Sequence, residues 1–142
     1  MPTPTLLEHH PLLVNLEPSQ LEHLANAGEV ESYNPGEAIV VEGSLGDALF
    51  LILSGQCAVH KGAQTFATLQ GGEFFGEMSL IDEGPRSATA RVKGAAELIV
   101  ITKKSFRDML QNDPRVAAKV LLNLLKVANQ RLRRTTELIK HV

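Results

Sequence analysis

The spacing of hydrophobic residues changes twice along the chain, and each pattern predicts a different kind of element. Leu21, Leu24 and Ala25 share one face of a helix. Residues 29–104 instead alternate short apolar runs with glycine-rich breaks, which is typical of strands joined by turns. Helical spacing returns over residues 105–142. The sequence therefore predicts an α+β fold, with a central β unit flanked by an N-terminal helix and C-terminal helices.

The N-terminal helical segment, residues 1–28, carries start and stop signals. Ser19 and Glu22 have the spacing of a capping box, while Pro18 alternatively suits the first helical position. Gly28 is a typical helix terminator.

The central unit is predicted to be an antiparallel sandwich or roll. Ten of the eleven glycines lie between Gly36 and Gly94, where they separate the apolar runs. Turn signals include Ser54-Gly55 and Lys61-Gly62. The runs that predict strands are residues 38–41, 48–53, 57–60, 65–69 and 97–101.

A long helix is predicted at the C-terminus. Asp113 suits a helix cap and Pro114 the first turn, and no further glycine or proline follows. A helix from Pro114 to about Lys140 would be roughly 40 Å long at ~1.5 Å per residue.

Two apolar stripes run along this long helix. The first comprises Val116, Val120, Leu124 and Val127. The second comprises Leu121, Leu125, Ala128, Leu132, Thr135 and Ile139. The second stripe has heptad-type spacing and favours a parallel homodimer seam, with packing of a lone helix on the β unit as the alternative.

Composition indicates one globular domain over residues 1–142. The mass is 15.4 kDa, with 44% hydrophobic and 21% charged residues. A single cysteine, Cys57, excludes an internal disulfide. The N-terminus does not resemble a secretory signal, and no apolar run is long enough to cross a bilayer. We therefore expect a cytoplasmic protein without a membrane segment.

Charge is unevenly distributed, although the net charge is only −2. Residues 1–104 carry 13 acidic and 6 basic side chains, whereas residues 105–142 carry 3 acidic and 8 basic ones. The basic helix end could contact nucleic acid or an acidic partner, or form a solvated surface; we favour the solvated surface.

An enzyme is not expected from this sequence. The five histidines are scattered, so no metal-ligand cluster is predicted. Asp82 and Glu83 are adjacent carboxylates in a glycine-bounded loop, which is typical of a solvated turn. No phosphate-binding P-loop or dinucleotide-binding glycine pattern is present.

The most informative stretch places a carboxylate and a guanidinium near each other along the chain. Gly76 precedes Glu77, and Arg86 follows nine positions later with the small residues Ser87 and Ala88 behind it. A planar guanidinium suits a phosphate, small residues leave backbone N–H donors accessible, and glutamate suits a sugar hydroxyl. The pair would bind a ribose and a phosphate held close together, with an ordinary Glu77–Arg86 ion pair as the alternative.

The pattern resembles the phosphate-binding cassette of cyclic nucleotide-binding domains, placed here at residues 75–89. Residues 75–80 read FGEMSL and residues 85–89 read PRSAT. That family includes the bacterial catabolite activator protein, regulatory subunits of cAMP-dependent protein kinase and cyclic nucleotide-gated channels. The resemblance covers nearly the whole chain and implies an antiparallel β-roll, or jelly roll.

The resemblance also implies a role for each residue of the cassette. Glu77 would accept a hydrogen bond from the ribose 2′-hydroxyl, beside the Gly76 backbone. Arg86 would hold the cyclic phosphate, aided by the Ser87 hydroxyl and by backbone N–H groups near Ser87 and Ala88.

Apolar residues complete the implied binding site. Phe75 and Met78 belong to the binding motif itself. Val59, Phe66 and Met78 fall where apolar side chains line the pocket in the family, with ordinary core packing as the alternative.

The long helix carries a second resemblance. Residues 131–137 are similar to the long helix of the catabolite activator protein, where adjacent hydroxyl residues meet the adenine. By that match Thr135 would contact the exocyclic amine, and Thr136 could reach the ligand of the other protomer. A solvated hydroxyl pair is the alternative. The ligand implied is cAMP, with cGMP open because Ser87 partly imitates a threonine found in guanine-preferring members.

The chain departs from the catabolite activator protein in two ways. Its cassette loop is one residue shorter, and it stops at Val142 without a helix-turn-helix, so sequence-specific DNA binding is not expected.

We expect a regulatory sensor domain whose downstream partner is unknown. The alternatives are a β-roll interaction module that binds no nucleotide, or the regulatory fragment of a longer transcription factor or channel.

Overall fold

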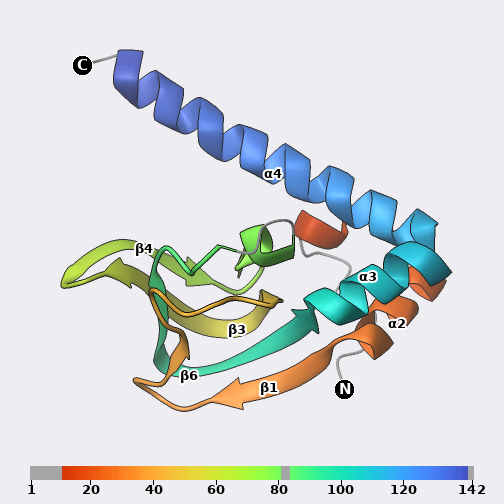
Figure 1. Cartoon of the computed structure of the whole chain (residues 1–142), viewed down its shortest axis with the longest axis horizontal. Helices are drawn as coiled ribbons and strands as arrows, with labels where there is room; N and C mark the ends of the chain where they lie inside the picture. Colours follow the sequence, from red (N-terminus) through yellow and green to blue (C-terminus); the bar gives the residue numbers. More distant parts are fainter. Residues whose placement is uncertain (1–10, 81–83, 141–142) are drawn as a thin grey trace.

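Two long strands form the centre of one antiparallel sheet (Figure 1). The computed structural model describes residues 11–80 and 84–140. The central strands β3 (Ala48–Lys61) and β6 (Thr89–Thr102) pair antiparallel over most of their length. The flanking strands are β1 (Glu29–Tyr33) and β2 (Ala38–Val40), paired with β6, and β4 (Gln64–Gln70) and β5 (Phe74–Phe75), paired with β3. The predicted α+β fold with an antiparallel β-roll is confirmed.

The predicted strand boundaries differ from the structure at two glycines. Ser54-Gly55, predicted as a turn, lies inside β3, where the register with β6 shifts. Gly55 has a φ of 90°, and a Cβ there would lie 2.4 Å from the Ala95 carbonyl oxygen. This bulge lets one strand bend without ending. The predicted run 97–101 is likewise only the last part of β6, which passes through Gly94.

Most helical segments lie at one end of the sheet, and the longest begins there and extends well beyond the others (Figure 1). They are the 3₁₀ turn η1 (Pro11–Leu13) and the helices α2 (Pro18–Ala27), α3 (Lys103–Asn112) and α4 (Pro114–Lys140). The capping box predicted at Ser19 and Glu22 is wrong, because Pro18 is the first helical residue. The side chain of Gln20 instead accepts a hydrogen bond from the Glu17 N–H at 2.9 Å. The helix ends at Gly28, as predicted.

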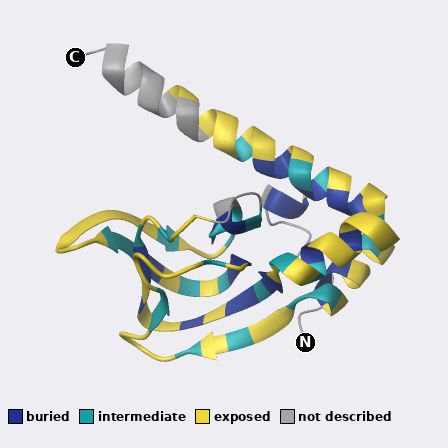
Figure 2. Cartoon of the chain, viewed as in Figure 1, coloured by how far each residue is buried: buried dark blue, intermediate teal, exposed yellow. Residues whose placement is uncertain are grey.

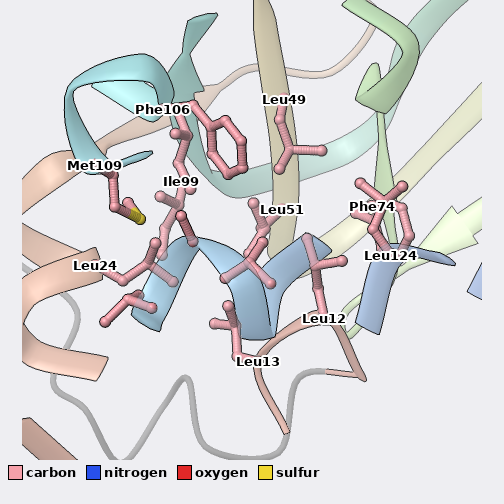
Figure 3. Close-up of a cluster of buried hydrophobic side chains, with 14 of the residues drawn as sticks. Leu12, Leu13, Leu24, Leu49, Leu51, Phe74, Ile99, Phe106, Met109 and Leu124 are labelled. Carbon is pink, nitrogen blue, oxygen red and sulfur yellow. The ribbon is translucent and has the colours of Figure 1, made fainter. Parts of the chain in front are cut away.

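Two hydrophobic clusters hold the fold together. The helical cluster joins one face of the sheet to the helices, as the labelled side chains of Leu12, Leu49, Phe74 and Leu124 show (Figure 3). The roll cluster lies inside the sheet and includes Phe50, Phe75 and other residues of β3 and β6. The two clusters meet at β5, where Phe74 belongs to the first and Phe75 to the second.

The first half of α4 is anchored to the body of the protein. Val116, Val120 and Leu124 are buried in the helical cluster (Figure 2). The side-chain amide of the buried Asn123 donates hydrogen bonds to the carbonyl oxygens of Leu12 and Val14, at 2.9 and 2.8 Å. Together these contacts fix the position of α4 against η1.

Among the described side chains of the second stripe of α4, only the first is covered. Leu121 is partly buried against the helical cluster, whereas Leu125 is 64% exposed and Ala128 is also exposed. The side chains of Leu132, Thr135 and Ile139 lie outside the described part of the structure. Among the described side chains, this apolar stripe is therefore open to solvent at Leu125 and Ala128.

Candidate functional site

A cavity of about 590 Å³ opens between the roll and the cassette. Its apolar wall is formed by Val40, Val59, Ala67 and Leu69. Its polar wall is formed by the cassette residues Gly76, Glu77, Ser79, Arg86, Ser87 and Ala88. The size falls within the range of small-molecule sites, and one apolar and one polar wall suit an amphipathic ligand.

The cassette begins with a sharp change of direction at Gly76. β5 ends at Phe75, and Gly76 adopts a φ of 84°, a left-handed conformation that favours glycine. The 3₁₀ turn η2 (Glu77–Leu80) follows, and Glu77 is its first residue. This turn brings the Glu77 carboxylate to the cavity wall.

Phe75 supports this turn from within the roll. Its ring stacks on Phe50 of β3, with ring centroids 5.0 Å apart and an interplanar angle of 13°. The two residues also pair across β3 and β5. An offset aromatic pair of this kind gives the floor of the site a fixed geometry.

Arg86 is held by the backbone at several points. Its Nη2 donates to the carbonyl oxygen of Ala48 at 3.2 Å, and its guanidinium carbon lies 5.7 Å from the centre of the Phe50 ring. The backbone N–H of Arg86 donates to the carbonyl oxygen of Ser44 at 2.7 Å. The hydrogen bond to Ala48 and the Phe50 ring therefore hold the guanidinium in the cavity wall, and the bond to Ser44 holds the Arg86 backbone.

The electrostatic surroundings of Arg86 combine burial with nearby carboxylates. Partial burial lowers the pKa of the guanidinium, while the charges of Asp47 and Glu77 act in the opposite direction. A guanidinium remains charged even so, because its ordinary pKa lies far above neutrality. A partly desolvated, permanent positive charge at a cavity wall is well suited to an anionic ligand.

Most of the predicted site residues lie on the wall of this one cavity. Phe75, Gly76, Glu77, Arg86, Ser87 and Ala88 are among its lining residues. Val59 also lines it, whereas Phe66 is 59% exposed on β4 and is not among those residues. The side chains of Met78, Thr135 and Thr136 lie outside the described part of the structure.

Sequence reasoning included Ser79 and Gly46 in the family resemblance but assigned neither of them a role in the site. Ser79 is 7% exposed and lines the cavity, whereas sequence reasoning included it in the cassette motif without predicting a role for it. Gly46 lies in the loop between β2 and β3, more than thirty residues before Arg86, yet it lies against the guanidinium. The three glycines within residues 36–46 were the sequence feature that could have indicated the importance of that loop.

The described residues show neither a metal-ligand cluster nor a membrane-spanning helix. Within residues 11–80 and 84–140, histidine, cysteine and acidic side chains do not gather in threes as a metal site would require. Across the same ranges, every helix is too short or too polar to cross a membrane.

Comparison with known proteins identifies the family of this chain. The family described as "Cyclic nucleotide-binding domain" matches residues 30–113, which span both walls of the cavity. The chain belongs to the cyclic nucleotide-binding domain family. In this member of the family, α2 precedes the β-roll along the chain, and α3 and α4 follow it.

Individual members of the family are similar over most of this chain. The cyclic AMP receptor protein of Thermus thermophilus is 36% identical over 128 residues, covering 87% of this chain. A cGMP-dependent protein kinase of Eimeria tenella is 43% identical over 97 residues, covering 68% of this chain. The chain spans 57% of the receptor protein and 10% of the kinase.

The fold is similar to that of solved members. A cyclic nucleotide-binding domain from Methylobacillus flagellatus superimposes with a TM-score of 0.84 at 28% identity, covering 96% of this chain and 80% of that domain.

Proposed function

We propose that this domain is a regulatory sensor that binds a 3′,5′-cyclic nucleotide, with a preference for cAMP. The observation that carries the proposal is the presence of Glu77 and Arg86 on one wall of a single 590 Å³ cavity. A cyclic nucleotide has a ribose hydroxyl close to its phosphate, so one carboxylate and one guanidinium can bind both groups at once.

In this proposal the polar wall of the cavity holds the sugar and the phosphate. The Glu77 carboxylate accepts a hydrogen bond from the ribose 2′-hydroxyl, next to the Gly76 backbone. The Arg86 guanidinium binds the phosphate, together with the Ser87 hydroxyl and the N–H groups near Ser87 and Ala88. Partial burial of Arg86 supports this role, because a charge pair in a desolvated site is stronger than one in bulk water.

The apolar wall then receives the base. Val59, Ala67 and Leu69 offer hydrocarbon surface and no side-chain hydrogen-bond donor, so they suit a purine without selecting one. Selection of adenine is assigned to Thr135 and Thr136 of α4. Ser87, directly after Arg86, is the feature that would instead favour cGMP.

We further propose that the domain forms a homodimer through α4 and that ligand binding shifts this helix. The open apolar face around Leu125 and Ala128 supports the dimer, since an exposed heptad-type stripe requires a partner helix. Phe74, which directly precedes the cassette, belongs to the same hydrophobic cluster as Leu124 of α4, and this supports the coupling. Ligand would stabilise one of two helix positions.

Calorimetric titration with cAMP and with cGMP tests the proposal; the chain has no tryptophan for a fluorescence measurement. Saturable binding, tighter for cAMP, supports both the sensor and the threonine assignment. Equal affinity for the two nucleotides would support the sensor function but contradict the selection of adenine by Thr135 and Thr136. Absence of binding to either would instead favour the interaction module that binds no nucleotide.

A further inference from the structure

The loop between β2 and β3, residues 41–47, is bonded directly to the cassette around Arg86. The N–H of Gly43 donates to the carbonyl oxygen of Arg86 at 2.9 Å, and the Arg86 N–H donates to that of Ser44 at 2.7 Å. Leu45 and Pro85 form an antiparallel bridge beside these bonds. The backbones of the loop and the cassette therefore form a short two-stranded ladder that fixes the Arg86 backbone, while the Leu45 side chain is exposed to solvent.

The same loop also leaves space for the Arg86 side chain. A Cβ atom at Gly46 would lie 2.3 Å from Nε and 2.4 Å from Cζ of Arg86, and 2.2 Å from Oγ of Ser79. These separations are far below van der Waals contact. The guanidinium and the Ser79 hydroxyl therefore occupy the volume that any side chain at position 46 would need.

A second glycine bounds the guanidinium on another side. A Cβ at Gly76 would lie 2.8 Å from Nη1 of Arg86 and 2.8 Å from the carbonyl oxygen of Ala48. The guanidinium thus lies in a slot between Gly46 and Gly76, two residues that are thirty positions apart in sequence. The carbonyl of Ala48 accepts from Nη2 in the same slot.

We propose that Gly46 is a positioning residue for ligand binding: its missing side chain gives the Arg86 guanidinium the place from which it meets the phosphate. This inference rests on the proposed binding of a cyclic nucleotide by Arg86. It adds a residue outside the cassette to the set that determines affinity.

Gly46 is also the position at which this role can be separated from folding. Its backbone is not left-handed, so alanine can adopt it without strain, unlike at Gly76 with its φ of 84°. The atoms that an alanine would meet are the ends of the Arg86 and Ser79 side chains, which can rotate away. Gly46→Ala is therefore expected to fold normally and to displace the guanidinium.

The test compares Gly46→Ala with wild type and with Leu45→Ala, a change in the adjacent residue, whose side chain is 79% exposed. Calorimetric titration with cAMP is expected to show a loss of affinity of about tenfold or more in Gly46→Ala, since hydrogen bonds to a charged group contribute that much. Leu45→Ala is expected to bind as wild type does. Thermal unfolding midpoints of all three proteins should agree closely.

A measurement without ligand distinguishes positioning from a general defect. The Nε–H resonance of Arg86, assigned by its loss in Arg86→Ala, should shift in Gly46→Ala and stay in place in Leu45→Ala. Wild-type affinity in Gly46→Ala, or lost affinity with an unmoved resonance, would overturn the inference while leaving the proposed function intact. A wild-type protein that binds no cyclic nucleotide would overturn the proposed function, and this inference with it.

Discussion

Phe74 and Phe75 are neighbours in the chain, yet their side chains belong to two different hydrophobic clusters. Phe74 packs with the helical residues, including Leu124 of α4 (Figure 3), whereas Phe75 stacks on Phe50 inside the roll. Alternation of side chains across a strand produces this split. β5 consequently places one side chain in the cluster that contains the long helix and the next side chain in the cluster inside the roll.

Phe75→Leu should weaken both the fold and the site. Loss of the stacked pair with Phe50 is expected to lower the free energy of unfolding by about 1–2 kcal/mol, measured by urea denaturation. Affinity for cAMP should fall as well, because the Phe50 ring lies 5.7 Å from the Arg86 guanidinium carbon. Phe106→Leu, in the helical cluster on α3, is the control and should lose stability alone. An equal loss of affinity in both variants would contradict this role for Phe75.

Asn123 should contribute to stability through hydrogen bonds rather than through apolar burial. Asn123→Ala leaves the carbonyl oxygens of Leu12 and Val14 without this donor, and is expected to cost about 1–3 kcal/mol in thermal or urea unfolding. Asn129→Ala, at an exposed position on the same helix, should be nearly neutral. Equal stability of the two variants would show that the amide contributes nothing to the anchoring of α4.

The elements that could be predicted from sequence are those whose signal is local. The apolar stripe of α4 lies within one helix, and the motif around Glu77 and Arg86 lies within one short segment. Each can therefore be recognised from residues that are close together in sequence. The continuity of β3 through Gly55 could not be predicted, because a bulge and a turn have the same sequence signature and only the β6 partner distinguishes them. β1 was missed because its exposed, acidic sequence EVESY lacks an apolar run.

The site shows the same division between local and distant information. The cassette motif identified the polar wall, since Glu77 and Arg86 are only nine residues apart. The role proposed for Gly46 depends on its contact with Arg86, which lies forty positions later in the chain, and the glycine pattern around Gly46 does not identify that partner.

The proposed dimer predicts a sensitive position on the open face of α4. Leu125→Glu places a charge in the apolar seam and should convert a dimer to a monomer, measured as molar mass by light scattering. Leu110→Glu alters an exposed leucine of α3 away from that face and should leave the mass unchanged. A wild-type chain that is monomeric at high concentration, or a Leu125→Glu variant that stays dimeric, would contradict the seam.

The central claim is that Arg86 binds the phosphate of a cyclic nucleotide, and calorimetric titration of wild type and Arg86→Ala with cAMP tests it most directly. We predict saturable binding to wild type and a loss of affinity of about a hundredfold or more in Arg86→Ala, with the fold retained by circular dichroism. Arg107→Ala, which removes an exposed arginine of α3, controls for net charge and should bind as wild type does. Unchanged affinity in Arg86→Ala would contradict the claim.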